Sequence, residues 1–487
     1  MTVYQPVAVK PGKHLIGGEW TASRSGKTLE TINPATEKPL TTVAFGEKED
    51  VDAAVFAARR AFEEGPWSRM APRERGQLMH KLADLIEKNK TELAVLESMD
   101  NGKPVSECFG FDLPQVIETF RYYAGWADKI LGEVNPVDPR FFSYTLREPV
   151  GVVAQIIPWN FPLLMAAWKL GPALACGCTT ILKPAEQTPL SALRLGELIL
   201  EAGFPAGVVN IITGDGVAGA ALASHPGVDK VAFTGSTEVG KKVMETAARN
   251  LKRVSMELGG KAPNIVFEDA NVDLAVQGAV AAIFFNQGEV CCAGSRLFVH
   301  ERIHDIFVEK FTAAARALVI GNPLDSATTM GAQVSLEQHE KVLGYIQAGV
   351  KGGAKIATGG HSLRPKMGGF FMEPTIFTEA EPDMRIMKEE IFGPVVAARK
   401  FSKIEDLLSV ANDTTYGLSA GVWTKNMTLA HETARRLRAG TVWINCFNAF
   451  DPAVPFGGYK ESGFGRELGK AALDLYTEQK AVWVGLN

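Results

Sequence analysis

Residues 151–184 read GVVAQIIPWNFPLLMAAWKLGPALACGCTTILKP, and this stretch decides the fold. Its apolar run at 151–157 is typical of a buried strand, and the apolar segment at 163–176 is long enough for a helix. A second short apolar run follows at 179–182. The order of strand, helix and strand predicts a parallel unit whose strands are covered on both faces.

The same stretch allows a second interpretation, because residues 150–168 carry no charge and are long enough to cross a bilayer. Gly151, Pro158 and Pro162 interrupt this run, however, and Gln155 within it is polar. Proline inside a helix removes a hydrogen bond and kinks or breaks the helix. We therefore expect a strand, a turn and a buried helix, and no membrane partner.

The alternation of strands and helices continues to residue 257. It predicts an α/β fold with a parallel sheet and helices on both faces, and ligands of such sheets lie beyond the carboxyl ends of the strands. The further expected strands are 208–212, 228–233 and 253–257, and the further expected helices are 190–202, 217–224 and 237–249.

Helical patterns precede this block, and a second alternating block follows it from about residue 263. The tail at 473–484 holds two short apolar runs that are able to add a strand to the sheet of another subunit. The spacing of apolar residues predicts early helices at 48–63, 71–99 and 105–132, and later helices near 273–285, 303–318, 336–351, 403–411 and 428–438.

The composition is that of an ordinary globular protein, with 46% hydrophobic and 22% charged residues. Its 487 residues predict two or three domains. The net charge of −4 comes without a basic block, so nucleic acid is not an expected partner. The six cysteines are too sparse for a disulfide framework, and no secretory signal is visible, so we expect free thiols and a cytoplasmic location.

Two adjacent cysteines, Cys291 and Cys292, lie in a Gly-bounded and mostly uncharged segment at 284–297. A thiol in a turn with backbone amides nearby is a candidate nucleophile, although buried structural cysteine is the commoner case. Two other segments favour a nucleophile, because Glu257 supplies a carboxylate and Asn160 supplies a side-chain amide donor.

Two strand ends offer a nucleotide site. Phe233–Gly240 leads from a strand into a helix, where glycine lets a phosphate approach the backbone and the positive helix terminus. It matches neither G-x-G-x-x-G nor a Walker loop, and many such turns contain glycine without binding nucleotides. Lys183 and Glu186 follow another strand; a carboxylate there accepts both ribose hydroxyls and favours NAD over NADP, whereas a surface ion pair is the alternative.

The segment from His300 to His304 matches the zinc motif H-E-x-x-H letter for letter. That motif requires both histidines on one face of a helix. Here residues 295–299 have the pattern of a strand and the next helix is expected to start near Ile303, so the two rings do not converge. We expect no metal site.

Taken together, these motifs resemble the NAD(P)-dependent aldehyde dehydrogenases. The resemblance extends from about Leu15 to Val484 and is closest to the broad branch that oxidises aliphatic and aromatic aldehydes, such as phenylacetaldehyde dehydrogenase. The matching stretches are Pro158–Pro162, Lys183–Glu186, Phe233–Gly240, Glu257–Lys261, Phe285–Arg296, Glu389–Pro394 and Pro455–Lys460.

The resemblance implies a Rossmann-like cofactor domain, an α/β catalytic domain and a small β oligomerisation domain. It also implies a homo-oligomer, either a dimer or a tetramer. The expected boundaries are 1–128 with 149–257 for the NAD-binding domain, 258–456 for the catalytic domain, and 129–148 with 457–487 for the oligomerisation domain.

By the same resemblance, Cys291 is the nucleophile and Glu257 the general base. The side chain of Asn160 and the amide of Cys291 form the oxyanion hole, and Lys169 and Glu467 pass protons outward from the base. A carboxylate at Glu257 favours hydrolysis over acyl transfer to coenzyme A, and a non-catalytic relative would have no need of these groups.

The implied cofactor is NAD, with Lys183 and Glu186 at the adenosine ribose, Ser236 at the pyrophosphate, and Glu390 with Phe392 at the nicotinamide riboside. Glu478, an interface position, is expected to support this site through Arg253 and Arg466. The remaining cofactor contacts are expected from Ile156, Pro158, Trp159, Gly216, Phe233, Gly235 and Leu258.

The implied substrate tunnel is apolar, which favours an uncharged hydrophobic aldehyde. Phenylacetaldehyde-type substrates rank first, then short aliphatic aldehydes and then betaine aldehyde. Aminoaldehyde enzymes place a carboxylate near the position of Gln115, although Asp112 and Asp451 are close enough to leave the charge of the tunnel open. The tunnel residues are Phe161, Met165, Trp168, Phe285, Val290, Cys292, Phe450 and Phe456.

Overall fold

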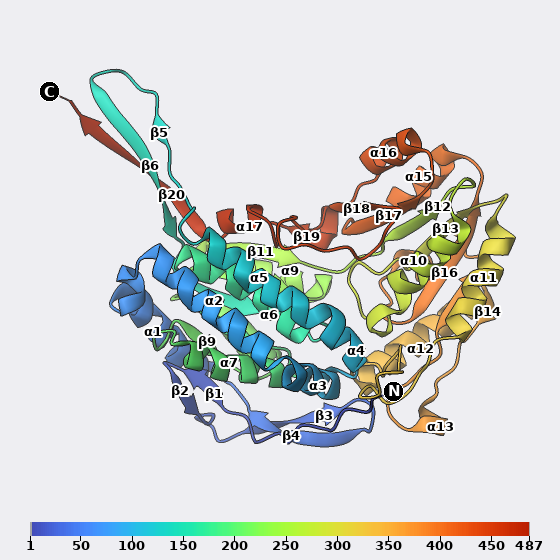
Figure 1. Ribbon diagram of the computed structural model, residues 1–487, viewed down its shortest axis with the longest axis horizontal. Coiled ribbons are helices and arrows are strands. Elements are labelled where there is room, and N and C mark those ends of the chain that lie inside the picture. The colour runs from blue at the N-terminus through green and yellow to red at the C-terminus, as the bar shows by residue number, and fades with distance from the viewer. Residues whose placement is uncertain (1, 487) are drawn as a thin grey trace.

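The computed structural model describes residues 2–486 and contains two large sheets, each with helices on both faces, and a small sheet that projects from the body (Figure 1). The stretch quoted first forms β7 (Val152–Ile156), α6 (Pro162–Cys176) and β8 (Thr179–Lys183). Every residue of these three elements is buried. The segment is apolar on all sides because other elements cover it on all sides.

The first sheet has eight strands in the order β19-β11-β10-β7-β8-β9-β1-β2. Its central strands are parallel, as predicted, and its edges are antiparallel. One face packs against α6 and α7, which α2 and α5 cover on the outside, and the other face packs against α1, α8 and α9. The bounds not yet given are β1 His14–Ile16, β2 Glu19–Thr21, β9 Val209–Ile211, β10 Lys230–Thr234, β11 Arg253–Glu257, β19 Gly463–Phe464, α1 Lys48–Glu63, α2 Pro72–Lys88, α5 Leu113–Trp126, α7 Leu190–Ala202, α8 Gly216–Ser224 and α9 Thr237–Ala247.

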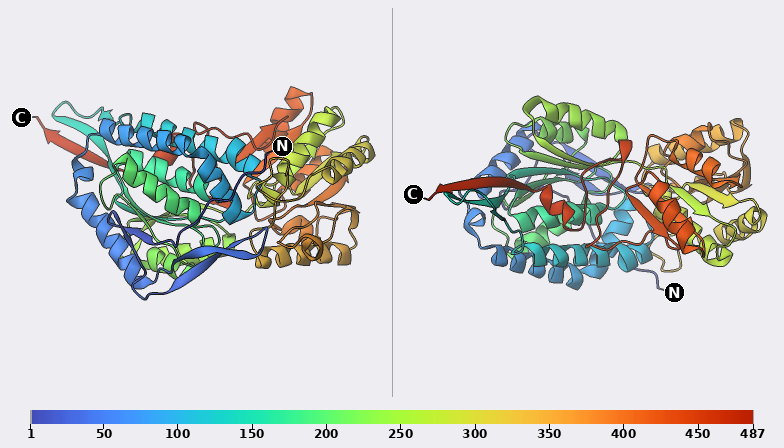
Figure 2. Two further views of the ribbon diagram at one scale, coloured as in Figure 1. Left: turned by 60° about the horizontal axis from the view of Figure 1, so that its bottom comes forward. Right: turned by 90° about the horizontal axis from the view of Figure 1, so that it is seen from above.

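The second sheet has seven strands in the order β14-β15-β16-β13-β12-β17-β18, all parallel except β14. It forms the second body in Figures 1 and 2. The strands are β12 Pro263–Val266, β13 Arg296–His300, β14 Lys355–Thr358, β15 Thr375–Thr378, β16 Val395–Phe401, β17 Ser419–Trp423 and β18 Thr441–Ile444; the helices are α10 Val272–Phe284, α11 His304–Arg316, α12 Leu336–Lys351, α13 Arg364–Met367, α14 Arg385–Lys388, α15 Ile404–Asn412 and α16 Met427–Arg436.

The third sheet forms an arm that points away from both bodies (Figure 2). It consists of β5 (Val134–Asn135), β6 (Phe141–Pro149) and β20 (Thr477–Gly485). The tail strand β20 pairs along its length with β6 of its own chain. The short helix α17 (Ala471–Asp474) leads into the arm. The domain boundaries expected from the sequence stay a prediction, and one strand placed with the arm, β19, in fact edges the first sheet.

Several elements differ from the expectation. The early segment is not only helical, because β1 and β2 extend the first sheet, and β3 (Thr28–Asn33) pairs with β4 (Lys38–Ala44). The expected helix at 71–99 is two helices, because Asn89 leaves helical geometry with ψ of 16° before α3 (Lys90–Asn101) begins. The expected helix at 105–132 starts as α4 (Val105–Glu107), passes through a π-helical turn η2 at Cys108–Asp112 and ends at Trp126.

Two findings concern membranes and metals. Between residues 2 and 486, no helix combines the length and apolarity that crossing a bilayer requires. Over the same residues, the structure holds no group of three or more His, Cys, Asp or Glu side chains arranged for a metal ion. His300 ends β13 and His304 begins α11, so the H-E-x-x-H segment does not lie on one helix.

Two glycines in helices test how closely the second body is packed. A Cβ atom on Gly278 of α10 would lie 2.1 Å from the ring of Trp423, whose indole N–H donates to Asn264, whereas one on Gly344 of α12 would meet nothing within 4 Å. We expect Gly278→Ala to lower the free energy of unfolding by about 1–3 kcal/mol through overpacking. Gly344→Ala should raise it by about 0.5–1 kcal/mol, because alanine has the higher helix propensity. Thermal unfolding at equal protein concentration measures both, and a stabilising effect of Gly278→Ala would contradict the packing seen here.

Candidate active site

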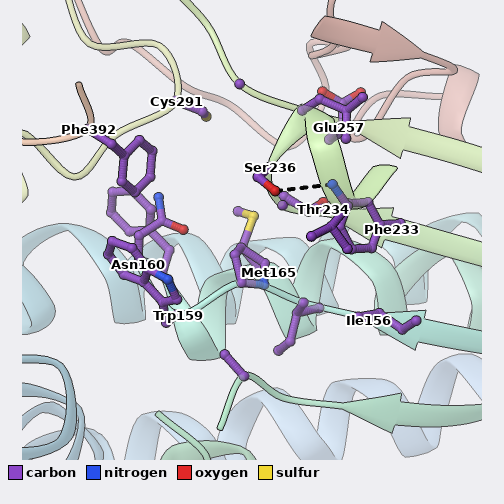
Figure 3. Close-up of a pocket in the computed structure, with 18 of the residues that line it drawn as sticks. Ile156, Trp159, Asn160, Met165, Phe233, Thr234, Ser236, Glu257, Cys291 and Phe392 are labelled. Carbon is purple, nitrogen blue, oxygen red and sulfur yellow. Dashed lines mark hydrogen bonds between the residues drawn. The ribbon is translucent and has the colours of Figure 1, made fainter. Parts of the chain in front are cut away.

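A cavity of about 650 Å³ lies at the carboxyl ends of the first sheet and reaches across to the second body. Ile156, Lys183, Thr234 and Glu257, which are the last residues of β7, β8, β10 and β11, all line it. Figure 3 shows side chains from several of these strand ends directed at one space. Every residue predicted to contact substrate or cofactor lines the cavity, whereas the predicted proton route, Lys169 and Glu467, and the predicted supporting residues Arg253, Arg466 and Glu478 do not.

Cys291 lies in the loop between η4 (Phe285–Gly288) and β13, and its side chain is partly exposed at the cavity. The pKa of its thiol is raised well above the usual range, first by the hydrogen bond with the Cys292 thiol and then by removal from water. Cys292 is buried, and its Sγ lies 3.5 Å from Oδ1 of Asn448. Cys291 is therefore the member of the pair that a ligand in the cavity can reach.

A left-handed turn precedes this cysteine. Asn286, Gln287 and Gly288 have φ angles of 48°, 46° and 75°. Such angles are readily adopted by glycine but are strained for most other residues. Gly288 is required for a second reason, because a Cβ atom there would lie 2.3 Å from the backbone of Gly393.

Asn160 is buried beside this turn. Its Nδ2 donates to the carbonyl of Glu289 at 2.9 Å, and its own carbonyl accepts from Nδ2 of Asn286 at 2.9 Å. A side-chain amide has two N–H groups, so one remains to face the cavity. The backbone N–H of Cys291 makes no hydrogen bond among the described residues. Two donors are therefore available beside the thiol.

Glu257 ends β11 with its carboxylate buried at the edge of the cavity. Neither oxygen has a hydrogen-bond partner within residues 2–486. Burial raises the pKa of Glu257 well above its usual range, and the nearby Glu467 raises it further. The carboxylate also needs a glycine beside it, because a Cβ atom on Gly457 would lie 2.6 Å from Oε1.

Behind Glu257, Lys169 and Glu467 form a buried ion pair. Nζ of Lys169 lies 2.6 Å from Oε1 of Glu467, and both side chains are almost fully enclosed. The second oxygen of Glu467 has no partner among the described residues. These groups stand next to the carboxylate and do not touch the cavity, which is compatible with a role in moving protons to and from it.

The half of the cavity that is lined by Lys183, Glu186 and Ser236 fits a dinucleotide. Ser236 is the N-cap of α9 and accepts from the amide of Val239, so the positive terminus of that helix faces the cavity. Lys183 lies 3.3 Å from Glu186 in an ion pair at the end of β8, and burial lowers the pKa of this lysine. A buried ammonium and a half-exposed carboxylate are suitable partners for the hydroxyls of a ribose.

Trp159 and Phe392 both line the cavity, with their rings edge to face and their ring centroids 5.1 Å apart. Close by, Oε1 of Glu390 accepts the amide of Gly260 at 2.8 Å. Burial raises the pKa of Glu390. This arrangement holds Glu390 at the place where the two halves of the cavity meet.

The remaining part is an aromatic tunnel. The rings of Phe111 and Phe285 meet edge to face, with their centroids 5.2 Å apart. The ring centroid of Phe450 lies 5.4 Å from that of Phe456 and 6.0 Å from that of Trp168. Such a wall binds apolar rings and chains. The sequence left the charge of the tunnel open because of Asp112 and Asp451, but neither acid lines the tunnel. Asp112 is fully buried in a pair with Lys103, and Asp451 is exposed outside the tunnel.

Several lining residues were not expected from the sequence. Phe111 lies in the π-helical turn, where helical periodicity fails, and Asn448 lies in an irregular loop. Glu337 and Lys341 come from α12 of the second body.

The support expected from Glu478 involves only one of the two predicted arginines. Glu478 pairs with Arg253 at 3.0 Å, whereas Arg466 donates to the carbonyls of Gly458 and Gly465.

Comparisons with known proteins agree with this geometry. The model of the aldehyde dehydrogenase family matches residues 20–482. The mitochondrial aldehyde dehydrogenase of Homo sapiens is 55% identical over 472 residues, which are 96% of this chain and 91% of the human protein. The mitochondrial benzaldehyde dehydrogenase of Antirrhinum majus is 52% identical over 99% of this chain and 90% of its own length. The NAD⁺ complex of an aldehyde dehydrogenase from Bacillus cereus superposes with a TM-score of 0.97 at 52% identity, covering 98% of this chain and 97% of the other.

The raised pKa of Cys291 predicts slow alkylation near neutral pH. Only the thiolate reacts, so below the pKa the rate should rise about tenfold for each pH unit. We expect iodoacetamide to label Cys291 of the ligand-free protein with a rate that still increases at pH 9, as followed by peptide mass spectrometry. Cys291→Ser should lose this label and retain labelling of the exposed Cys446. A rate already constant at pH 7 would show that the thiol is ionised and the inferred environment wrong.

Proposed function

Because the chain belongs to the aldehyde dehydrogenase family, we propose that Cys291 is the nucleophile with which it oxidises a hydrophobic, preferably aromatic, aldehyde to the carboxylic acid. NAD is the cofactor, as supported by the dinucleotide-shaped half of the cavity and by the NAD⁺ complex of the Bacillus cereus protein. The observation that carries the proposal is the meeting of Cys291, Asn160 and Glu257 on one cavity.

In the first step the Cys291 thiol gives its proton to a base, for which we propose Glu257, and the thiolate attacks the carbonyl carbon. A carbon–sulfur bond forms, and the electron pair of the C=O bond moves to the oxygen. The alkoxide of this thiohemiacetal needs donors, which the free N–H of Asn160 and the amide of Cys291 supply. NAD held by Lys183, Glu186 and Ser236 would supply the hydride acceptor. The C=O bond re-forms as the hydride leaves, and the acyl group remains on Cys291 as a thioester.

The second step is hydrolysis of that thioester. A water molecule needs a base as it attacks, and our proposed base is Glu257, a cavity carboxylate whose two oxygens accept no hydrogen bond among the described residues. Burial raises its pKa, so Glu257 stays protonated to a higher pH than an exposed carboxyl group, and the basic form increases with pH. Lys169 and Glu467, enclosed behind it, are our proposed route for the proton that Glu257 takes up.

The substrate proposal rests on the tunnel. Its aromatic walls and the absence of a carboxylate among its described lining near Gln115 favour an uncharged ring over a cationic aldehyde. The name of the Antirrhinum majus relative, a benzaldehyde dehydrogenase, supports an aromatic substrate. Phenylacetaldehyde-type substrates therefore stay first, ahead of short aliphatic aldehydes and betaine aldehyde.

We further propose that the arm joins subunits into a dimer or tetramer. Phe142 and Trp483 are 42% and 61% exposed on its strands, which is unusual for side chains of this size. Sedimentation equilibrium measures the assembly.

We also propose that the protein is cytoplasmic. All six cysteines are unpaired, which fits the cytoplasmic location expected from the sequence.

Cys291→Ala tests the chemistry. We expect this change to abolish aldehyde-dependent formation of NADH, because no other cysteine replaces the nucleophile, while NAD still binds. Absorbance of NADH and quenching of protein fluorescence by NAD measure the two effects. In the unchanged enzyme, mass spectrometry after acid quenching should place an acyl group on Cys291. Retained turnover in the variant would overturn the assignment.

Gln115→Glu tests the substrate class. We expect the unchanged enzyme to show its highest kcat/KM with phenylacetaldehyde, a lower value with propionaldehyde and the lowest with betaine aldehyde. The introduced carboxylate should raise kcat/KM for betaine aldehyde by about fivefold, the effect of ~1 kcal/mol from a partly screened charge pair. Propionaldehyde is the control. It is uncharged and too short to reach the introduced carboxylate, so its kcat/KM should not change. A preference of the unchanged enzyme for betaine aldehyde would refute the ranking.

A further inference from the structure

A segment whose polar side chains are mostly buried, residues 97–112, crosses from the first body to the second beside the active site. It spans the end of α3, the α4 helix and η2, and we name it the clasp. Figure 1 shows α4 at the junction of the two bodies. Two backbone hydrogen bonds fasten it to the second body, from Val105 to Pro323 at 2.8 Å and from Ala332 to Gly102 at 3.1 Å.

Two carboxylates of the clasp accept backbone N–H groups in the active-site loops. Oε2 of Glu107 accepts the N–H of Asn286 at 2.9 Å, at the first residue of the left-handed turn before Cys291. Oε2 of Glu97 accepts the N–H of Leu163 at 3.1 Å, in the first turn of α6 and three residues after Asn160. The clasp therefore contacts both segments that supply the proposed oxyanion donors, the β7–α6 loop with Asn160 and the turn before Cys291.

The Glu107 contact continues to Asn160 itself. Asn286 receives the carboxylate on its backbone and uses its side chain to donate to the carbonyls of Asn160 and Glu289. The amide of Asn160 in turn donates to Glu289. A left-handed turn of non-glycine residues persists only where its surroundings hold it in place. Glu107 is the acceptor that fixes the first residue of this turn.

The clasp is itself held rigidly. Nζ of Lys103 lies 2.7 Å from Oδ2 of Asp112, and both side chains are fully buried. The same ammonium stands 4.0 Å from the ring centroid of Phe161, directly after Asn160 in the chain. A second side chain, Asn101, donates to the carbonyl of Trp159 at 2.8 Å. The loop at 159–161 is thus contacted by the clasp at its backbone and at its ring.

From these contacts we propose that Glu107 is a positioning residue for aldehyde oxidation, which acts through Asn286 to hold Asn160 at the developing alkoxide. The proposal rests on the function proposed above. Glu107 touches neither the cavity nor a reacting atom, so its effect is on alignment, and misplacement by about 1 Å is enough to lower a rate by about 10².

Glu107→Leu and Glu107→Gln provide the test. Leucine leaves the N–H of Asn286 without an acceptor, whereas glutamine retains an acceptor oxygen of the same reach. We expect Glu107→Leu to lower kcat by about tenfold to 10²-fold, as misalignment of an oxyanion donor should, with little change in NAD affinity. Glu107→Gln should restore most of the rate. Ser106→Ala, whose hydroxyl is directed to the carbonyl of Thr328, is the control on the same helix.

A double-mutant cycle with Asn160→Ala separates positioning from a general structural effect. If Glu107 acts through Asn160, adding Glu107→Leu to Asn160→Ala should lower kcat by less than about twofold, because residues that act as a unit are non-additive. Independent, multiplying losses would overturn the proposal. If Glu107→Leu fails to fold, Asn286→Asp, which keeps the left-handed turn but loses the donor to Asn160, enters the same cycle with the same expectation.

Hydrogen exchange distinguishes a failure of this proposal from a failure of the proposed function. Peptides covering 285–291 should exchange faster in Glu107→Leu than in Glu107→Gln, whatever the substrate of the enzyme. Faster exchange with an unchanged kcat would overturn the positioning role alone. Full activity of Asn160→Ala would instead overturn the oxyanion assignment of the proposed function, and with it the route by which Glu107 acts.

Discussion

The active site depends on close approaches to the chain that only glycine permits. A Cβ atom on Gly260, just after β11 of the first sheet, would lie 2.2 Å from the carbonyl oxygen of Cys291, so only glycine allows the cysteine loop to reach this place. Gly288 against Gly393 and Gly457 against Glu257 are equally crowded. Each contact leaves no room for a methyl group, and together they bring the thiol over the strand ends of the other sheet.

The close packing of the site also determines the pKa values of its nucleophile and its base. The carboxylate of Glu257 and the ion pair of Lys169 with Glu467 lie in a region closed to water, where an uncompensated charge is costly. Burial therefore raises the pKa of Glu257, and the thiol of Cys291 is kept neutral by its neighbour Cys292 and by burial. In the ligand-free protein both the nucleophile and the base are therefore shifted toward their protonated forms.

Much of the fold followed from periodicity, and some did not for identifiable reasons. The stretch 151–184 predicted β7, α6 and β8 because a strand covered on both faces and a buried helix are apolar throughout. The break at Asn89 was missed because α2 and α3 keep apolar spacing on either side of one non-helical residue. The strands β1 and β2 were missed because strands of three residues carry too little pattern.

The sequence by itself determined the parallel α/β architecture, the chemical groups at the strand ends and their resemblance to one family, since these depend on local order along the chain. Only the tertiary structure decided which groups meet. It placed Asp112 beside Lys103 and away from the tunnel, brought Phe111 and Lys341 to the cavity, and connected Glu107 to Asn286, 179 residues away. Such pairings depend on how two sheets are packed together, and hydrogen bonds between distant backbone and side-chain atoms leave no periodic trace in the order of the residues.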